Sequence, residues 1–211
     1  MIPESQFPNL SVETEQRTTG RLLALLVMGQ IKPSSDGALN VMVMSFARLV
    51  DGALLDYQCA REAFYQFYRD PNLGGSLPVS AALVPCFHHI ENCLTNLVRA
   101  FEMGDAVRCK KLLRGKKSLI DKNDWKLAVT HEPSISGLRN VIQHRYNKQK
   151  KGAQVQGTIE YRESGQIALS VHVLSLTDLA RTLQRLKKIA CKVVEAQREM
   201  QGLPIIIKQQ I

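Results

Sequence analysis

The stretch ALNVMVMSFARLVDGALLDYQCAREAFYQFYRD, from Ala38 to Asp70, decides the fold class of this chain. Its apolar residues recur at the spacing of an amphipathic helix, and no proline interrupts it. The residues of this stripe are Val43, Phe46, Ala47, Val50, Leu54 and Tyr57. The stretch therefore predicts a long helix at the centre of an all-α protein, with the other helices packed around it as an antiparallel bundle.

Three further long helices are expected from the same periodicity and from their start and stop signals. They run from about residue 78 to Met103 before Gly104, from Pro133 to about Gln149, and from Ser175 to Gly202. Pro85 lies inside the first of these ranges, so that helix is expected to be kinked there or to begin later. Residues 105–113 are expected to form a short basic helix, with another short helix near Trp125.

Between residues 156 and 174 the apolar period changes from 3.6 to 2, which is typical of strands. Ile159 and Tyr161 alternate with polar residues before Ser164 and Gly165. A second alternating run follows, over residues 167–173. The pattern predicts a small β-hairpin inserted before the last helix, with one apolar face on the helical body.

The expected organisation is one domain with two short appendages. Residues 1–37 are interpreted as an N-terminal arm packed on the body, in which Leu22 to Met28 forms a short helix or a strand. Residues 38–203 form the single helical domain, and residues 204–211 form a short apolar tail. The only long apolar run near the start is too short to span a bilayer, so no membrane contact is expected.

The five cysteines are scattered, odd in number and never arranged as CxxC. No secretory signal opens the chain. We therefore expect a cytoplasmic protein with buried, reduced thiols. The common phosphate-loop, dinucleotide, esterase and zinc-protease motifs are missing from the sequence, and no cofactor is expected.

The excess positive charge is concentrated in one segment. Of the net charge of +9, all lies between Asp105 and Lys151, where 13 Lys/Arg face 4 Asp/Glu. Such a segment is either a surface for nucleic acid or a solvated face. Trp125 is the nearest aromatic residue, which favours contact with phosphates over base reading. The candidate RNA-binding residues are Arg108, Lys110, Lys111, Arg114, Lys116, Lys117, Arg145 and Lys148.

Inside this segment lies the run Arg139-Asn140-Val141-Ile142-Gln143-His144-Arg145-Tyr146. An imidazole such as that of His144 takes or gives a proton near neutral pH. The forked guanidinium of Arg139 suits the charge that develops on a phosphoryl group during cleavage. Asn140 is a candidate to orient the histidine or to bond a phosphate oxygen. These are the groups that metal-free cleavage of a phosphodiester requires.

Arg139 and His144 are expected to point in different directions from their helix. Each residue advances an α-helix by about 100°, so Arg139 and His144 differ by about 140°. Asn140 and His144, four residues apart, share a face. One helix therefore does not aim the guanidinium and the imidazole at the same atom. Two copies of the helix that meet across a two-fold axis would bring them together, so we expect a homodimer.

The R-N-x3-H-x-Y pattern resembles the signature of the HEPN superfamily, most closely its HepT-type toxin branch. The resemblance implies a helical dimer whose motif helices pair, with Arg139 and His144 as catalytic residues in the cleft between protomers. It implies a metal-independent endoribonuclease, used as a toxin in toxin–antitoxin or phage-defence systems. It also implies that Glu91 supports the site, and that Tyr146 is adenylylated by a nucleotidyltransferase antitoxin. The N-terminal arm, the hairpin and the basic run after Tyr146 depart from the HepT pattern.

Each of these assignments has a structural alternative. Tyr146 is otherwise a core or interface aromatic, and Glu91 an exposed carboxylate. The whole chain is otherwise a non-catalytic helical module that binds nucleic acid or a partner protein through residues 105–151. A group of metal-ligating residue types also lies on the second helix, at Cys86, His88, His89 and Cys93, for which buried packing is expected and no metal site.

Overall fold

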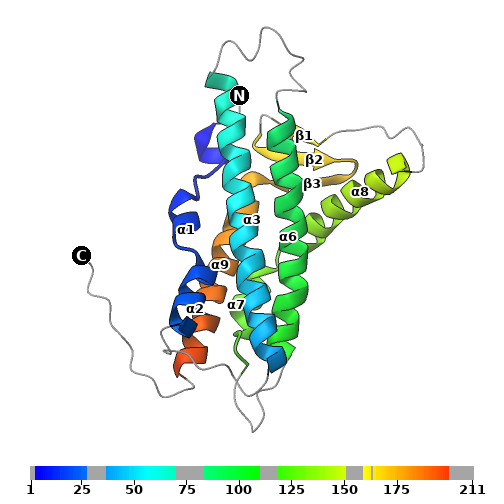
Figure 1. Cartoon of the computed structure of the whole chain (residues 1–211). Coiled ribbons are helices and arrows are strands. Elements are labelled where there is room, and N and C mark those ends of the chain that lie inside the picture. The colour runs from blue at the N-terminus through cyan, green and yellow to red at the C-terminus, as the bar shows by residue number, and fades with distance from the viewer. Residues whose placement is uncertain are drawn as a thin grey trace.

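The structure is a computed structural model that describes residues 3–27, 37–69, 83–109, 118–150, 159–162 and 164–199. Over these residues the protein is mostly helical, with a small antiparallel sheet before the last helix (Figure 1). The elements in chain order are the 3-10 helix η1 (Glu4–Gln6), α1 (Ser11–Glu15), α2 (Thr18–Val27), α3 (Gly37–Arg69), α6 (Val84–Cys109), α7 (Lys122–Ala128), α8 (Glu132–Lys150), β1 (Glu160–Arg162), β2 (Gln166–Leu169), β3 (His172–Ser175) and α9 (Leu176–Glu199).

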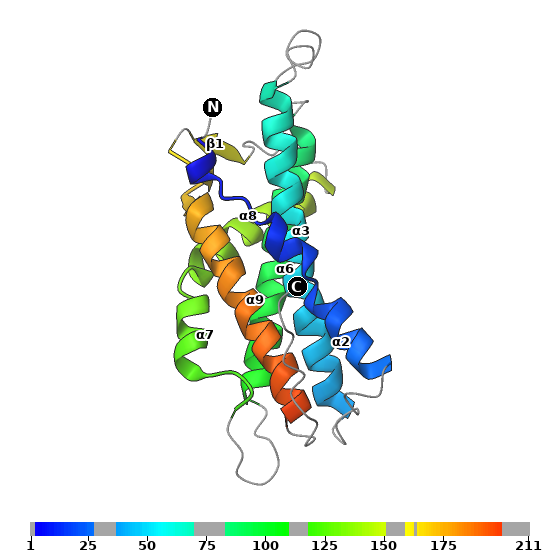
Figure 2. The same cartoon turned by 90° about the vertical axis from the view of Figure 1, so that its left-hand side faces the viewer.

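The core is built on an antiparallel hairpin of α3 and α6, and α9 packs along α3 (Figures 1 and 2). The apolar stripe predicted for the first long helix is buried, as is the facing stripe of α6. The first, third and last long helices are confirmed close to their predicted bounds. The second begins at Val84, so Pro85 lies in the first turn, where its missing N–H leaves no helical hydrogen bond unmade.

Gly104 does not end α6, contrary to the prediction. The helix continues to Cys109, and Gly104 is buried against the ring of Trp125 from α7. A Cβ at residue 104 would lie 2.1 Å from Cη2 of that ring. The Trp125 indole also donates a hydrogen bond to Asp105 at 3.0 Å. The glycine therefore permits a close contact and is no stop signal. Residues 105–109 belong to α6, and the rest of the short basic helix predicted there lies outside the described residues.

The sheet has three strands where a two-stranded hairpin was predicted. A tight turn at Ser170 and Val171 splits the second alternating run into β2 and β3, with strand order β1-β2-β3. Ser170 has a φ of 57°, a left-handed conformation that two-residue hairpin turns require. Val171 is consequently exposed in the turn, and Val173 faces away from the buried Ile167.

Part of the N-terminal segment packs on the bundle as short helices. The stretch from Leu22 is helical in α2, which removes the alternative of a strand. Leu22 and Leu25 are buried, and α2 contacts α3 and α9. Residues 28–36 and the apolar tail at 204–211 lie outside the described residues, as does the predicted start of the hairpin at 156–158.

Helix α3 is long and apolar enough to cross a membrane, with a mean hydropathy of 1.5 over its most apolar 18 residues. The central helix of a soluble bundle has the same composition. In this structure α3 contacts α1, α2, α6 and α9, and its apolar stripe is the one that these neighbours cover.

The five cysteines have different environments among the described residues. Cys86 and Cys93 are buried, and Cys59 and Cys191 are half-buried. Cys109, at the end of α6, is exposed, so the prediction of uniformly buried thiols is wrong for that residue.

Candidate functional site

Helix α8 carries the Arg-Asn-His run and stands out from the bundle. Its buried residues Ile135, Leu138 and Ile142 lie on one stripe and dock the helix on α6 and on the sheet. The axis of α8 diverges from α6, so the C-terminal end of α8 projects away from the body (Figure 1). The motif thus begins beside the packed stripe, and its His144 is exposed beyond Ile142, the last buried residue of that stripe.

Arg139 is half-buried at the border of the packed stripe. One of its terminal nitrogens donates a hydrogen bond to the side-chain oxygen of Asn140 at 3.2 Å. Its Nε is buried and has no hydrogen-bond partner among the described residues. An unsatisfied buried donor costs about 1–3 kcal/mol, so this arginine is not optimised for stability.

Asn140 and His144 are both exposed, on the side of α8 that faces away from the core stripe. Their shared face agrees with their spacing of four residues. The hydrogen bond to Asn140 turns the Arg139 side chain around the helix. Its guanidinium therefore lies closer to the face that carries Asn140 and His144. Within the described residues, however, no hydrogen bond joins Arg139 to His144. The structure thus brings together Arg139 and Asn140, and leaves His144 further along the same helix.

Several predicted site residues have side chains outside the described residues. The backbone of Arg145, Tyr146 and Lys148 is helical within α8, but their side chains lie outside the described residues. The same holds for the whole basic segment from 110 to 117, which contains Lys110, Lys111, Arg114, Lys116 and Lys117.

Two other predicted residues lie on α6, the helix on which α8 packs. Glu91 is half-buried there and takes part in an interaction of its own. Arg108 is ion-paired with Asp105 at 3.1 Å, next to the Trp125 contact. Its charge therefore helps to hold the end of α6, in addition to any role toward RNA.

A residue that the sequence analysis missed lies against α8. His172, at the start of β3, packs on the backbone of Gly137, where a Cβ would approach its Nδ1 to 2.3 Å. A glycine inside a helix costs roughly 1 kcal/mol relative to alanine, and here the close approach of an imidazole accounts for it. The glycine two residues before Arg139 was the available signal, but it does not say which residue fills the space.

The metal-ligating residue types on α6 do not converge. Cys86 and Cys93 are in the core, where burial raises the pKa of the Cys86 thiol to about 12, although the neighbouring Tyr161 hydroxyl opposes this. The two histidines have separate partners, and only His88 is exposed. His89 faces Asp56 at 3.4 Å, while His88 bonds Asn92 at 3.2 Å. No group of three or more ligands occurs in the described part of the chain.

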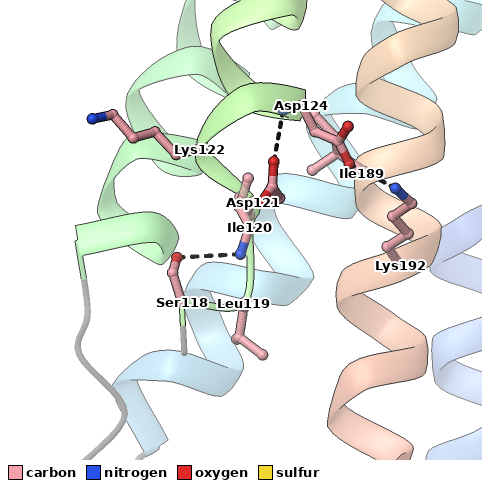
Figure 3. Close-up of a pocket in the computed structure, with 8 residues that line it drawn as sticks. All are labelled: Ser118, Leu119, Ile120, Asp121, Lys122, Asp124, Ile189 and Lys192. Carbon is pink, nitrogen blue, oxygen red and sulfur yellow. Dashed lines mark hydrogen bonds and ion pairs between the residues drawn. The ribbon is translucent and has the colours of Figure 1, made fainter. Parts of the chain in front are cut away.

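A surface cavity of about 400 Å³ lies between the start of α7 and the last turns of α9 (Figure 3). The charged side chains of Asp121, Asp124 and Lys192 are already engaged. Asp121 caps α7 by accepting hydrogen bonds from the backbone of Asn123 and Asp124, and Lys192 pairs with the Asp124 carboxylate at 2.6 Å. None of the residues that line it comes from α8. The cavity is thus a seam between two helices and holds none of the candidate catalytic groups.

No family model, no curated protein and no solved structure matches this chain.

Proposed function

We propose that this protein is a HEPN-type, metal-independent endoribonuclease whose site is completed across a homodimer interface. The observation that carries the proposal is the arrangement on α8. Asn140 holds the Arg139 guanidinium, and the same amide lies on the exposed face that presents His144. A fixed cation and an accessible imidazole on one projecting helix suit phosphoryl transfer.

The dimer is part of the proposal because of the geometry of one protomer. Arg139 and His144 leave the helix about 140° apart, and neither bonds the other in the described part of the chain. The projecting end of α8 is free to lie beside the same helix of a second copy (Figure 1). In such a pair, the guanidinium of one protomer would reach the imidazole face of the other.

The first experiment measures RNA cleavage in EDTA with the wild-type protein and with His144→Ala, Arg139→Ala and His88→Ala. Removal of the imidazole or the guanidinium is expected to lower the rate by about 10²-fold or more, because each stabilises the transition state directly. His88 is exposed on α6, away from the motif helix, so its variant should cleave at the wild-type rate. Equal cleavage by wild type and His144→Ala would exclude the catalytic role.

Mixing the two inactive variants tests whether the site is shared. If Arg139 and His144 come from different protomers, every mixed dimer has one doubly altered site and one intact site. Refolding equal amounts of Arg139→Ala and His144→Ala together should then restore about a quarter of wild-type activity, since about half of the dimers are mixed. If both residues act within one protomer, every site in the mixture carries one lesion and no activity returns.

The alternative of a binding module rests on the basic segment. It predicts RNA binding that weakens steeply with salt, that survives Arg139→Ala, and that occurs without cleavage. A role as a toxin with a nucleotidyltransferase antitoxin, including adenylylation of Tyr146, is the part of the proposal that depends on the resemblance alone. Adenylylation would be tested by a mass shift of wild type, but not of Tyr146→Phe, with such an enzyme and ATP.

A further inference from the structure

The chain has five histidines, and the structure divides them into two groups. Three have side-chain partners: His88 bonds Asn92, while His89 and His131 face carboxylates. The other two, His144 and His172, have no hydrogen-bond partner in the part of the chain that the structure describes. Neither ring has a buried nitrogen that lacks a partner, so both can be reached by solvent.

These two unpartnered histidines approach the same face of α8. His172 arrives from β3 and lies on Gly137, and His144 belongs to the helix itself. Residues 137 and 144 are seven positions apart, so they differ by only about 20° around the axis and by about 10 Å along it. Helical side chains lean toward the N-terminus, which tilts the His144 ring back toward His172. Asn140 is exposed as well, about 40° around the helix from His144 and at a level along the axis between residues 137 and 144.

The contact with Gly137 makes this placement specific. Any side chain at residue 137 would collide with the His172 ring, which has its Nδ1 2.3 Å and its Cε1 2.4 Å from the position of a Cβ. His172 is directly paired across the sheet with Leu169, on the buried side of the sheet. An apolar side chain at residue 172 would be enough to pack against Gly137. The imidazole instead brings a titratable group beside the part of α8 that carries Asn140 and His144.

We infer that His172 and His144 form one phosphate-binding site on α8, in which a scissile RNA phosphodiester lies between two imidazoles with Asn140 beside it. This inference rests on the proposed function and adds a catalytic residue to it. Metal-free cleavage of RNA takes one proton from the 2′-oxygen and gives one to the 5′-oxygen, and the Arg-Asn-His run contains one imidazole for these two transfers. His172 supplies the second.

The chemical step then balances without a cofactor. One neutral imidazole takes the proton of the 2′-hydroxyl as the 2′-oxygen forms a bond to phosphorus. The bond from phosphorus to the 5′-oxygen breaks, and the other imidazole, initially protonated, gives its proton to that oxygen. The products are a 2′,3′-cyclic phosphate and a 5′-hydroxyl, and proton exchange with water resets both rings. Arg139, turned toward this face by Asn140 or supplied by a second copy, neutralises the phosphoryl oxygens.

The kinetic test compares His172→Gln, His144→Gln and His88→Gln over a range of pH in EDTA. With two imidazoles in opposite protonation states, the wild-type rate is expected to be bell-shaped in pH. His172→Gln should lower the maximum rate by about 10²-fold or more and remove one limb of the bell, and His144→Gln should remove the other. His88 is an exposed histidine on α6, and its variant should keep the wild-type profile. Far-ultraviolet circular dichroism checks that each variant is folded.

A second measurement does not depend on turnover. The wild-type protein is titrated with a nucleoside 3′-monophosphate while the imidazole C–H signals are followed by NMR. A shared site predicts that the signals of His172 and His144 shift together with one dissociation constant, while those of His88 stay in place. The response of one ring alone, or of neither, would overturn the inference.

The outcomes separate this inference from the proposed function. If wild type cleaves RNA and His172→Gln keeps its rate and both limbs, the ribonuclease proposal stands and His172 has no part in it. If wild type cleaves nothing, the ribonuclease proposal fails. The titration then decides alone whether the two rings form a common phosphate site.

Discussion

Asp51 connects three helices through a single carboxylate. From α3, it accepts hydrogen bonds from the first backbone N–H groups of α2, those of Thr18 at 3.2 Å and Thr19 at 2.7 Å. It also pairs with Lys187 of α9 at 2.9 Å, and both side chains are about 10% exposed or less. Lys187 donates a further hydrogen bond to the backbone oxygen of Gln16. The carboxylate thus caps α2 and fixes it to the bundle.

The ionisation of Asp51 should make stability depend on acid pH. Burial raises its pKa, but the hydrogen bonds from Thr19 and Lys187 outweigh burial, and the pKa lies below its ordinary value. A carboxyl whose pKa is lower in the folded state stabilises the fold fully above the unfolded value of about 3.9, and this contribution is lost as the pH falls further. Asp51→Asn is expected to lower the free energy of unfolding at pH 7 by about 3 kcal/mol, because Lys187 is left buried and unpaired.

Urea denaturation at pH 7 and pH 3 checks this expectation. The difference between wild type and Asp51→Asn should shrink at the lower pH, where the wild-type carboxyl also begins to be protonated. Glu195→Gln is the matched control, since it removes an ion pair with Arg21 in which both side chains are half exposed. That variant should change stability by less than about 0.5 kcal/mol at either pH. A loss for Asp51→Asn as small as that of the control would contradict a stabilising role for the network.

At the scale of helices and strands, the sequence predicts the elements that depend on local properties of the chain. The helices α3, α8 and α9 follow from periodicity and start signals, which are local properties of the chain. Ser175, where the last long helix was expected to start, accepts hydrogen bonds from the backbone N–H groups of Thr177 and Asp178, as an N-cap residue does. Helical phase is also local, so the common face of Asn140 and His144 was predictable.

The errors arise where a distant residue decides the local structure. Gly104 has the sequence of a helix stop, and only the ring of Trp125 explains why it lies inside a helix. Ser170 and Val171 are not a usual turn pair, so the alternating run over residues 167–173 predicts one strand where there are two. His172 was not predicted as a site residue for the same reason. Only its contact with Gly137, which belongs to α8, places it near the motif.

The contact between α6 and α7 can be tested through Gly104→Ala. The new methyl group would overlap a rigid indole that is also held by Asp105, so Trp125 must leave its place. We expect a loss of about 3 kcal/mol of stability, from overpacking and from the broken hydrogen bond. Trp125 is the only tryptophan, so a red shift of its fluorescence would report its exposure directly. Gly20→Ala in α2, where the nearest atom is 3.8 Å from the new Cβ, should be neutral or stabilising. A Gly104→Ala protein with unchanged fluorescence and stability would show that the indole is not packed this way.

At the scale of the whole molecule, the five cysteines differ in how deeply they are buried. Cys109 is at the surface, Cys59 and Cys191 are half-buried, and Cys86 and Cys93 are fully buried in the hairpin of α3 and α6. The Cys86 thiol donates a hydrogen bond to the Tyr161 hydroxyl at 3.0 Å, beneath the sheet. Reaching Cys86 therefore requires separation of the sheet from the helical pair, which removes part of the core.

In thiol labelling of the native protein at pH 8, cysteines that differ in burial should react at different rates. Cys109 is expected to react first, and Cys109→Ser should abolish that fast phase. Burial raises the pKa of the Cys86 and Cys93 thiols, so the reactive thiolate is scarce as well as inaccessible. Their labelling should proceed at the rate of global unfolding and rise with urea in parallel with it. If Cys86 reacts as fast as Cys59, the sheet opens independently of the bundle. In that case His172, which belongs to the same sheet, could not be held steadily against Gly137.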